Sequence, residues 1–151
     1  MDLIEISKDS KKDDLEDVVD MLRSQQTRFS GSRAKLKVDQ FLQMALEVGS
    51  PAKVFLLKKS DGTSVGMAFT NLCIGFETGG KYLWVNELYI NLEHRKKGYG
   101  KLLSKALMTW CAKNGVHAIY AVTSPLNKAS QAMMRQVGCK LTNTIWCDKQ
   151  I

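Results

Sequence analysis

The stretch from Lys81 to Met108 constrains the fold most, because a strand pattern there runs through a glycine loop into a helix pattern. Aromatic and β-branched residues between Tyr82 and Ile90 favour a strand, although Glu87 lies within it. The loop that follows contains Gly98 and Gly100, which allow several backbone N–H groups to face one concavity. The N-terminal end of the next helix adds its positive dipole there. This stretch therefore predicts a phosphate-binding site.

Positive charge is concentrated in the same half of the chain. Residues 94–147 contain nine Lys or Arg and no Asp or Glu, whereas residues 1–93 contain twelve basic and fourteen acidic residues. This asymmetry fits a ligand with several phosphates, and a solvated basic face or a nucleic-acid patch are the alternatives. Nucleic acid is not the expected partner, because Tyr99 is the only aromatic residue within the run of basic residues around the glycine loop.

The length of 151 residues predicts a single domain, residues 1–151, with a full hydrophobic core. No window approaches the roughly 18 apolar residues of a membrane span, and the start of the chain is acidic, so we expect a cytoplasmic protein without membrane contact. His94 and His117 lack partners at metal-ligand spacing, so no metal is expected. The cysteines lack CxxC spacing and are expected to be free, buried thiols: Cys73, Cys111, Cys139 and Cys147.

Hydrophobic periodicity and turn residues predict the order β-α-α-β-β-β-α-β-α-β. Three consecutive hairpin strands followed by β-α-β units imply a mixed sheet with helices on both faces. The expected strands are residues 3–6, 54–57, 65–76, 82–90, 117–122 and 141–147. The expected helices are residues 11–24, 34–48, about 101–114 and 127–137.

The spacing Arg95-x-x-Gly98-x-Gly100, after a strand that carries Glu87, resembles the acyl-CoA pyrophosphate-binding motif Q/R-x-x-G-x-G/A of the GNAT acyltransferase superfamily. The segment from Asn127 to Gly138 is similar to a second motif of that superfamily. Judged by the order of elements, the resemblance covers nearly the whole chain. It implies an α/β fold, called α+β in some schemes, with a mixed and mostly antiparallel sheet between helices.

The resemblance also implies acetyl-CoA as co-substrate. In GNAT-like proteins the strand that corresponds to the Glu87 strand splays from its neighbour. The resemblance implies that backbone groups near Leu88 to Ile90 bond the pantetheine and that an N–H near Ile90 polarises the acetyl oxygen. Backbone N–H groups of the glycine loop hold the diphosphate. The residues expected to bind the cofactor are Leu88, Tyr89, Ile90, Arg95, Lys96, Lys97, Gly98, Tyr99, Gly100, Lys101, Asn127 and Ser130.

Glu87 is the expected catalytic base, directly or through water. Freeing the lone pair of an amine of pKa about 10 costs roughly 4 kcal/mol at neutral pH, so a proton acceptor is needed. The alternative is an acid at a bend of the sheet that pairs with Lys or Arg or caps a backbone group.

One position departs from the superfamily. Where many relatives have a tyrosine that protonates the CoA thiolate, this chain has Met134, while Asn127 and Ser130 match the motif. Methionine cannot donate a proton. Asn127 is expected to bond the pantetheine amide, to cap its helix, or to do both.

The sequence thus predicts an N-acetyltransferase that transfers an acetyl group from acetyl-CoA to a primary amine of a small molecule, by direct transfer in a ternary complex. A polyamine is disfavoured, because a polycation requires an acidic channel. The alternatives are a protein N-terminal or lysine acetyltransferase, an acyl-CoA-binding module without catalysis, which Met134 allows, and a basic nucleic-acid binder. A homodimer is compatible with the sequence.

Overall fold

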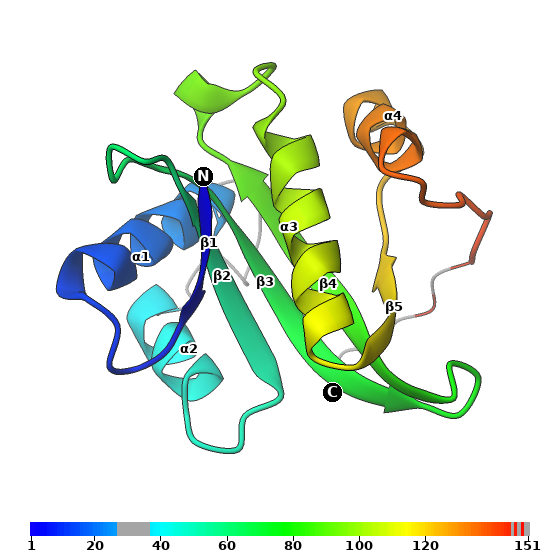
Figure 1. Ribbon diagram of the computed structural model, residues 1–151, viewed down its shortest axis with the longest axis horizontal. Helices are drawn as coiled ribbons and strands as arrows, with labels where there is room; N and C mark the ends of the chain where they lie inside the picture. The colour runs from blue at the N-terminus through cyan, green and yellow to red at the C-terminus, as the bar shows by residue number, and fades with distance from the viewer. Residues whose placement is uncertain (27–36, 146, 148, 150–151) are drawn as a thin grey trace.

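A computed structural model describes residues 1–26, 37–145, 147 and 149. In these residues, strands form one sheet in the order β1-β2-β3-β4-β5 (Figure 1). The strands are β1 (Asp2–Ile6), β2 (Ala52–Lys58), β3 (Ser64–Gly75), β4 (Gly80–Ile90) and β5 (Val116–Ala121). Neighbouring strands are antiparallel except for β4 and β5, which are parallel. The predicted mixed, mostly antiparallel sheet is confirmed.

Helices cover both faces of the sheet (Figure 1). They are α1 (Lys12–Gln26), α2 (Val38–Ala45), the 3-10 turn η2 (Leu92–His94), α3 (Tyr99–Lys113) and α4 (Lys128–Gln136). Helices α1 and α2 lie on one face, and α3, which connects β4 to β5, lies on the other. Helix α4 lies beside α3, where the Ser104 hydroxyl is 3.3 Å from the Met133 sulfur.

The core consists of two layers, because alternate residues of each strand face opposite sides of the sheet. In β2, Phe55 and Leu57 pack with residues of α3 and β4. Their neighbours Val54 and Leu56 pack with Val18 of α1 and with residues of α2 and β3. Strand β2 is therefore apolar on both faces, as its uninterrupted hydrophobic run indicates.

Polar contacts fasten α1 to the end of β2 and the start of β3. Lys58 of β2 pairs with the buried Asp14, and this hydrogen bond raises the pKa of Lys58. The Ser64 hydroxyl donates to an Asp17 carboxylate oxygen at 2.5 Å. These contacts fix the face of α1 that is turned toward the sheet.

The predicted order of elements is confirmed from the first strand to the last helix. The second helix is shorter than expected: it ends at Ala45, and residues 34–36 of the expected helix lie outside the described residues. The final strand predicted at 141–147 is wrong for its described residues, 141–145 and 147, which form no strand. Leu141 and Ile145 are both exposed, so their alternation does not mark a buried face. The described residues of this segment also form no strand pairs with β5.

The cysteines are free, as expected, but they are not all buried. Cys111 is on the buried side of α3, and burial raises the pKa of its thiol to about 11. Cys73 and Cys139 are half-buried and Cys147 is exposed. None of the helices in the described part of the chain combines the length and apolar character that crossing a membrane requires.

Gly66 sets the distance between β3 and β4 at the end of the sheet where the glycine loop begins. A Cβ at this position would lie 2.5 Å from both the backbone oxygen of Tyr89 and the Cδ1 of Ile90. We expect Gly66→Ala to lower the free energy of unfolding by about 1–3 kcal/mol, because the two strands must separate. Urea denaturation measures this change.

Gly100→Ala is the matched control for Gly66→Ala. Its Cβ would meet Ile90 and Met133 at 3.9 and 4.0 Å, which is ordinary contact, and alanine favours helix. We therefore expect Gly100→Ala to unfold at the same or a higher urea concentration than the wild type. If Gly66→Ala were as stable as Gly100→Ala, the close approach of the two strands would not be a constraint.

Candidate active site

Strand β4 has an extra residue next to Glu87. Phe69 of β3 lies opposite Glu87, but the next residue, Thr70, lies opposite Val85, so Asn86 is a bulge. A bulge bends a strand and re-aims the side chains beside it. The resemblance implied a distortion of this strand near Glu87, and the register places one at Asn86.

The bulge coincides with the point at which β4 and β5 separate. Their pairing ends at Val85 and Ala121, so residues 86–90 of β4 have no partner on β5 (Figure 1). A pocket of about 300 Å³ lies where the strands diverge. Its lining comes from β4, α3, β5, α4 and the segment after α4, and includes Leu88, Leu107, Ile119, Met134 and Cys139.

The backbone of Leu88 and Ile90 faces this opening. The N–H of Asn91 donates to the Val65 oxygen at 3.0 Å, on the β3 side. Backbone groups alternate between the two edges of a strand, so those of Leu88 and Ile90 face away from β3. The Ile90 oxygen indeed accepts a hydrogen bond from Arg95 Nε at 2.9 Å. The side chain of Tyr89, between these two residues, is buried on the other face of the sheet, where it packs beneath α1 and is 4% exposed.

The glycine loop turns through left-handed backbone conformations, with φ of 59° at Lys96 and 85° at Gly98. Gly98 precedes the first residue of α3, and no side chain caps the helix there. The first N–H groups of α3, from Tyr99 onward, therefore have no intrahelical acceptor. The first turn also lacks acidic residues. An anion is favoured at this helix end by both the free donors and the dipole.

Neighbouring side chains hold the loop in place. The guanidinium of Arg95 lies 5.4 Å from the centre of the Tyr89 ring, in addition to its bond to Ile90. The Tyr99 ring contacts His94, with 5.9 Å between the ring centres, and packs against the core. Arg95 and Tyr99 are thus occupied with protein contacts, whereas Lys96 and Lys97 are exposed.

Helix α4 closes the far side of the pocket. The Asn127 side chain accepts the N–H of Ser130 at 3.1 Å, so it caps α4. Of the two roles expected for Asn127, the structure has the cap. Met133 contacts α3, and Met134 lines the pocket. The position at which relatives carry a tyrosine therefore faces the opening between β4 and β5.

Glu87 lies on the opposite face of the sheet, toward α1. Its carboxylate accepts a hydrogen bond from Gln25 Nε2 at 3.2 Å. Gln25 is 8% exposed, in the last turn of α1. Sequence reasoning missed this residue by treating it as the start of a loop. The signal was its spacing, since Val18, Met21 and Gln25 continue one buried stripe of the helix.

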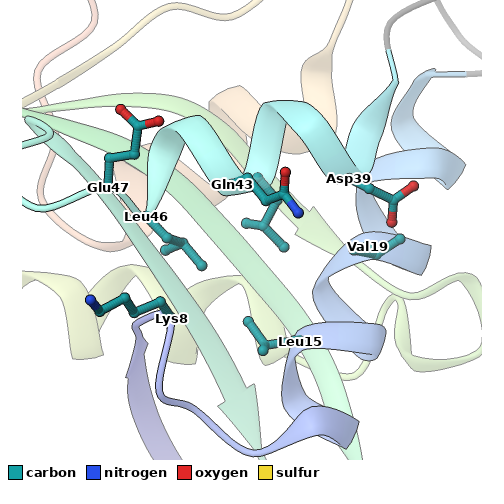
Figure 2. Close-up of a pocket in the computed structure, with 8 residues that line it drawn as sticks. Lys8, Leu15, Val19, Asp39, Gln43, Leu46 and Glu47 are labelled. Atoms are coloured by element: carbon teal, nitrogen blue, oxygen red, sulfur yellow. The ribbon is translucent and has the colours of Figure 1, made fainter.

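A second pocket, of about 390 Å³, lies between α1 and α2 (Figure 2). Leu15, Val19 and Leu46 contribute apolar surface, and polar side chains that include Lys8 and Asp39 surround it. It contains neither Glu87 nor any residue of the glycine loop, so it is separate from the candidate active site.

The fold resembles solved structures across the whole chain. An aminoglycoside 6'-N-acetyltransferase from Acinetobacter haemolyticus matches with a TM-score of 0.68 and 18% identity, covering 100% of this chain and 99% of that one. An aminoglycoside acetyltransferase from an uncultured soil metagenomic sample gives 0.77 and 13%, covering 99% and 95%. A ribosomal-protein-alanine N-acetyltransferase from Brucella melitensis biovar Abortus 2308 gives 0.75 and 15%, covering 99% and 100%.

At these identities the structural matches establish the fold alone. No curated protein sequence matches the chain. A sequence model of the acetyltransferase (GNAT) family, however, matches residues 16–139, which include the glycine loop, Glu87 and α4. The chain therefore belongs to the acetyltransferase (GNAT) family and is an acyltransferase enzyme.

Proposed function

We propose that the protein transfers an acetyl group from acetyl-CoA to a primary amine of a small molecule, by direct transfer in a ternary complex. One observation carries the proposal: the open edge of β4 at residues 88–90 lies between Glu87 and the uncapped start of α3. A single strand end thus supplies a carboxylate, backbone groups that β5 does not pair, and an anion site. We also propose that residues 1–151 form one domain and that the protein acts in the cytoplasm.

The residues present fit acetyl-CoA. The N–H groups of residues 96–101 would hold the diphosphate, because Gly98 has a left-handed φ and the helix start is uncapped. The pocket between β4 and β5 would take the pantetheine, with the backbone of Leu88 and Ile90 as its partners. When bound, acetyl-CoA supplies an acyl carbon that is open to attack and a thiolate leaving group.

The polar groups have separate tasks. The N–H of Ile90 is the proposed donor to the acetyl oxygen, where negative charge develops as the amine attacks. Glu87 accepts the proton that the amine loses, directly or through one water. Gln25 holds the carboxylate in its rotamer through the hydrogen bond at 3.2 Å and is a positioning residue. The new C–N bond forms as the C–S bond breaks.

The acceptor class has support of two kinds. The similar structures include enzymes whose names specify an aminoglycoside and the alanine of a ribosomal protein, which are both amine acceptors. The names support an amine acceptor but not an aminoglycoside itself, because an aminoglycoside is a polycation and Glu87 is the only acidic residue of β4. A protein N-terminus or a lysine side chain is the second candidate.

The test is to mix the protein with acetyl-CoA and a panel of amines, follow the release of free thiol, and identify products by mass spectrometry. Acetylation of small primary amines is the expected result. Turnover on peptides alone would favour the second candidate. Thermal stabilisation by CoA without turnover on any amine or peptide would favour an acyl-CoA-binding module.

Met134 offers a gain-of-function test of thiolate protonation. Because its side chain lines the pocket, a tyrosine at this position places a hydroxyl in the opening between β4 and β5. We expect Met134→Tyr to raise kcat by about 10-fold, below the usual range for a general acid because a thiolate also leaves unaided. The measurement is steady-state thiol release.

Met134→Phe is the matched control, because it supplies the same ring without the hydroxyl. Equal kcat for the Tyr and Phe variants would mean that protonation of the thiolate does not limit the rate, or that position 134 does not reach it. Thermal denaturation of both variants checks that they fold alike.

A further inference from the structure

Three aromatic side chains lie together on the face of the sheet that carries Glu87. Tyr82, Trp84 and Tyr120, which we call the aromatic face, come from β4 and β5. The intervening Leu83 is buried with α3, so its neighbours Tyr82 and Trp84 lie on the opposite side. The rings of Tyr82 and Tyr120 are in contact, with 5.4 Å between their centres.

The aromatic face is partly exposed, mainly through Tyr120. Tyr120 is 45% exposed, and Tyr82 and Trp84 are half-buried. Helices α1 and α2 pack over residues of β1, β2 and β3 and over Tyr89 of β4, and the core layer beneath them does not include the aromatic face. A surface of this kind presents ring faces, which attract flat apolar groups and cations.

The aromatic face is continuous with the candidate active site. Trp84 and Glu87 lie on the same face of β4, separated by one strand repeat and the bulge at Asn86. One repeat of two residues spans roughly 7 Å. Phe69, opposite Glu87, contacts the ring of Phe41 on α2 at 5.0 Å between centres and extends the apolar surface on the other side.

The charge of this surface fits a single amine. Among the described residues that the ladders place on this part of the face, Glu87 is the only charged side chain: Phe69, Asn71, Cys73, Tyr82, Trp84, Glu87, Ala118 and Tyr120. A hydrogen bond with Cys73 raises the pKa of Tyr82 above that of an ordinary phenol, which is itself neutral at physiological pH. One carboxylate beside neutral rings suits a group with one amine and one apolar ring.

We propose that the acceptor is an amine that carries a flat ring two or three carbon atoms from its nitrogen. The ring lies on the aromatic face while the nitrogen reaches Glu87, because this linker and one hydrogen bond together span roughly 7 Å. This inference rests on the proposed function and specifies its substrate class.

The test compares 2-phenylethylamine with n-butylamine, an amine without a ring, in the wild type and in Tyr120→Ala. Tyr120 is chosen because its exposed ring is the least needed for folding. We expect the wild type to prefer 2-phenylethylamine in kcat/KM. Tyr120 also lines the pocket between β4 and β5, so both amines are measured at saturating acetyl-CoA. We expect Tyr120→Ala to raise KM for 2-phenylethylamine by about 2- to 10-fold more than KM for n-butylamine, which corresponds to the free energy of one aromatic contact.

Phe76→Ala is the control variant, because Phe76 is a fully exposed aromatic residue beyond the end of β3. It is expected to leave both amines unaffected. Equal kcat/KM for the two amines in the wild type, or an equal loss for both in Tyr120→Ala, would overturn the inference while leaving the acetyltransferase activity intact.

A binding measurement keeps the inference separate from turnover. Titration of 2-phenylethylamine is expected to change the fluorescence of Trp84 in a saturable way. The change should be absent in Trp84→Phe and should require more amine in Tyr120→Ala. Absence of any saturable change in the wild type would overturn the inference, whereas failure of the proposed function would be seen as absence of thiol release with every amine.

Discussion

We expect Glu87→Gln to lower kcat by about 10²–10⁴-fold, the usual contribution of a general base. Glutamine preserves the size of the side chain and a hydrogen bond with Gln25, but it cannot accept the amine proton. The affinity for CoA should not change, because Glu87 lies on the opposite face of the sheet from α3. Steady-state kinetics and CoA binding measure the two effects.

The pH dependence separates a base from a structural carboxylate. In the wild type, kcat/KM should rise with pH as the base loses its proton. In Glu87→Gln the only remaining rise should come from deprotonation of the amine substrate. Glu93→Gln, which removes an exposed carboxylate from η2, is the control and should retain the wild-type profile. Equal profiles for the wild type and Glu87→Gln would contradict the role of Glu87 as base.

We expect Gly98→Glu to weaken CoA binding by at least about 10²-fold. Two effects combine: a side chain at φ of 85° costs roughly 1–2 kcal/mol in backbone strain, and the carboxylate repels the diphosphate at the helix start. A Cβ at this position would meet nothing within 4 Å, so steric overlap is not the cause. Isothermal titration calorimetry with CoA measures the change.

Two variants separate strain from charge at this position. Gly98→Asn is expected to retain most of the affinity, because asparagine tolerates the left-handed conformation and carries no charge. Gly62→Glu introduces the same charge at a φ of 86°, also with open space, but in the turn between β2 and β3. It should bind CoA as the wild type does. Equal losses in Gly98→Glu and Gly62→Glu would mean that the effect is general destabilisation.

Local patterns were sufficient to predict most of the fold. The stretch around Gly98 and Gly100 contains its own strand, turn and helix start, and the structure has β4, a left-handed Gly98 and α3 in that order. Elements set by short-range spacing, such as the β2–β3 hairpin around Gly62, are also as expected. The identification of the family rested on the same stretch, and the match over residues 16–139 confirms it.

Features that arise from pairing between distant segments were not predictable from local patterns. The bulge at Asn86 depends on the register between β3 and β4, and nothing at Asn86 itself marks it. The contact of Gln25 with Glu87 joins residues 62 apart in sequence. The last strand was overpredicted for a related reason, because alternation at 141–147 gives a β pattern whether or not the segment pairs with a strand.

Calorimetric titration of the wild-type protein with CoA and with pantetheine, which lacks the diphosphate and the nucleotide, tests the diphosphate site itself. We expect one CoA site per chain and, for pantetheine, an affinity at least about 10²-fold lower, because the amides around Gly98 then have no anion to bind. Affinity for CoA should also fall as salt rises. Absence of heat with CoA, or equal affinity for pantetheine, would contradict the assignment of the glycine loop as a diphosphate site.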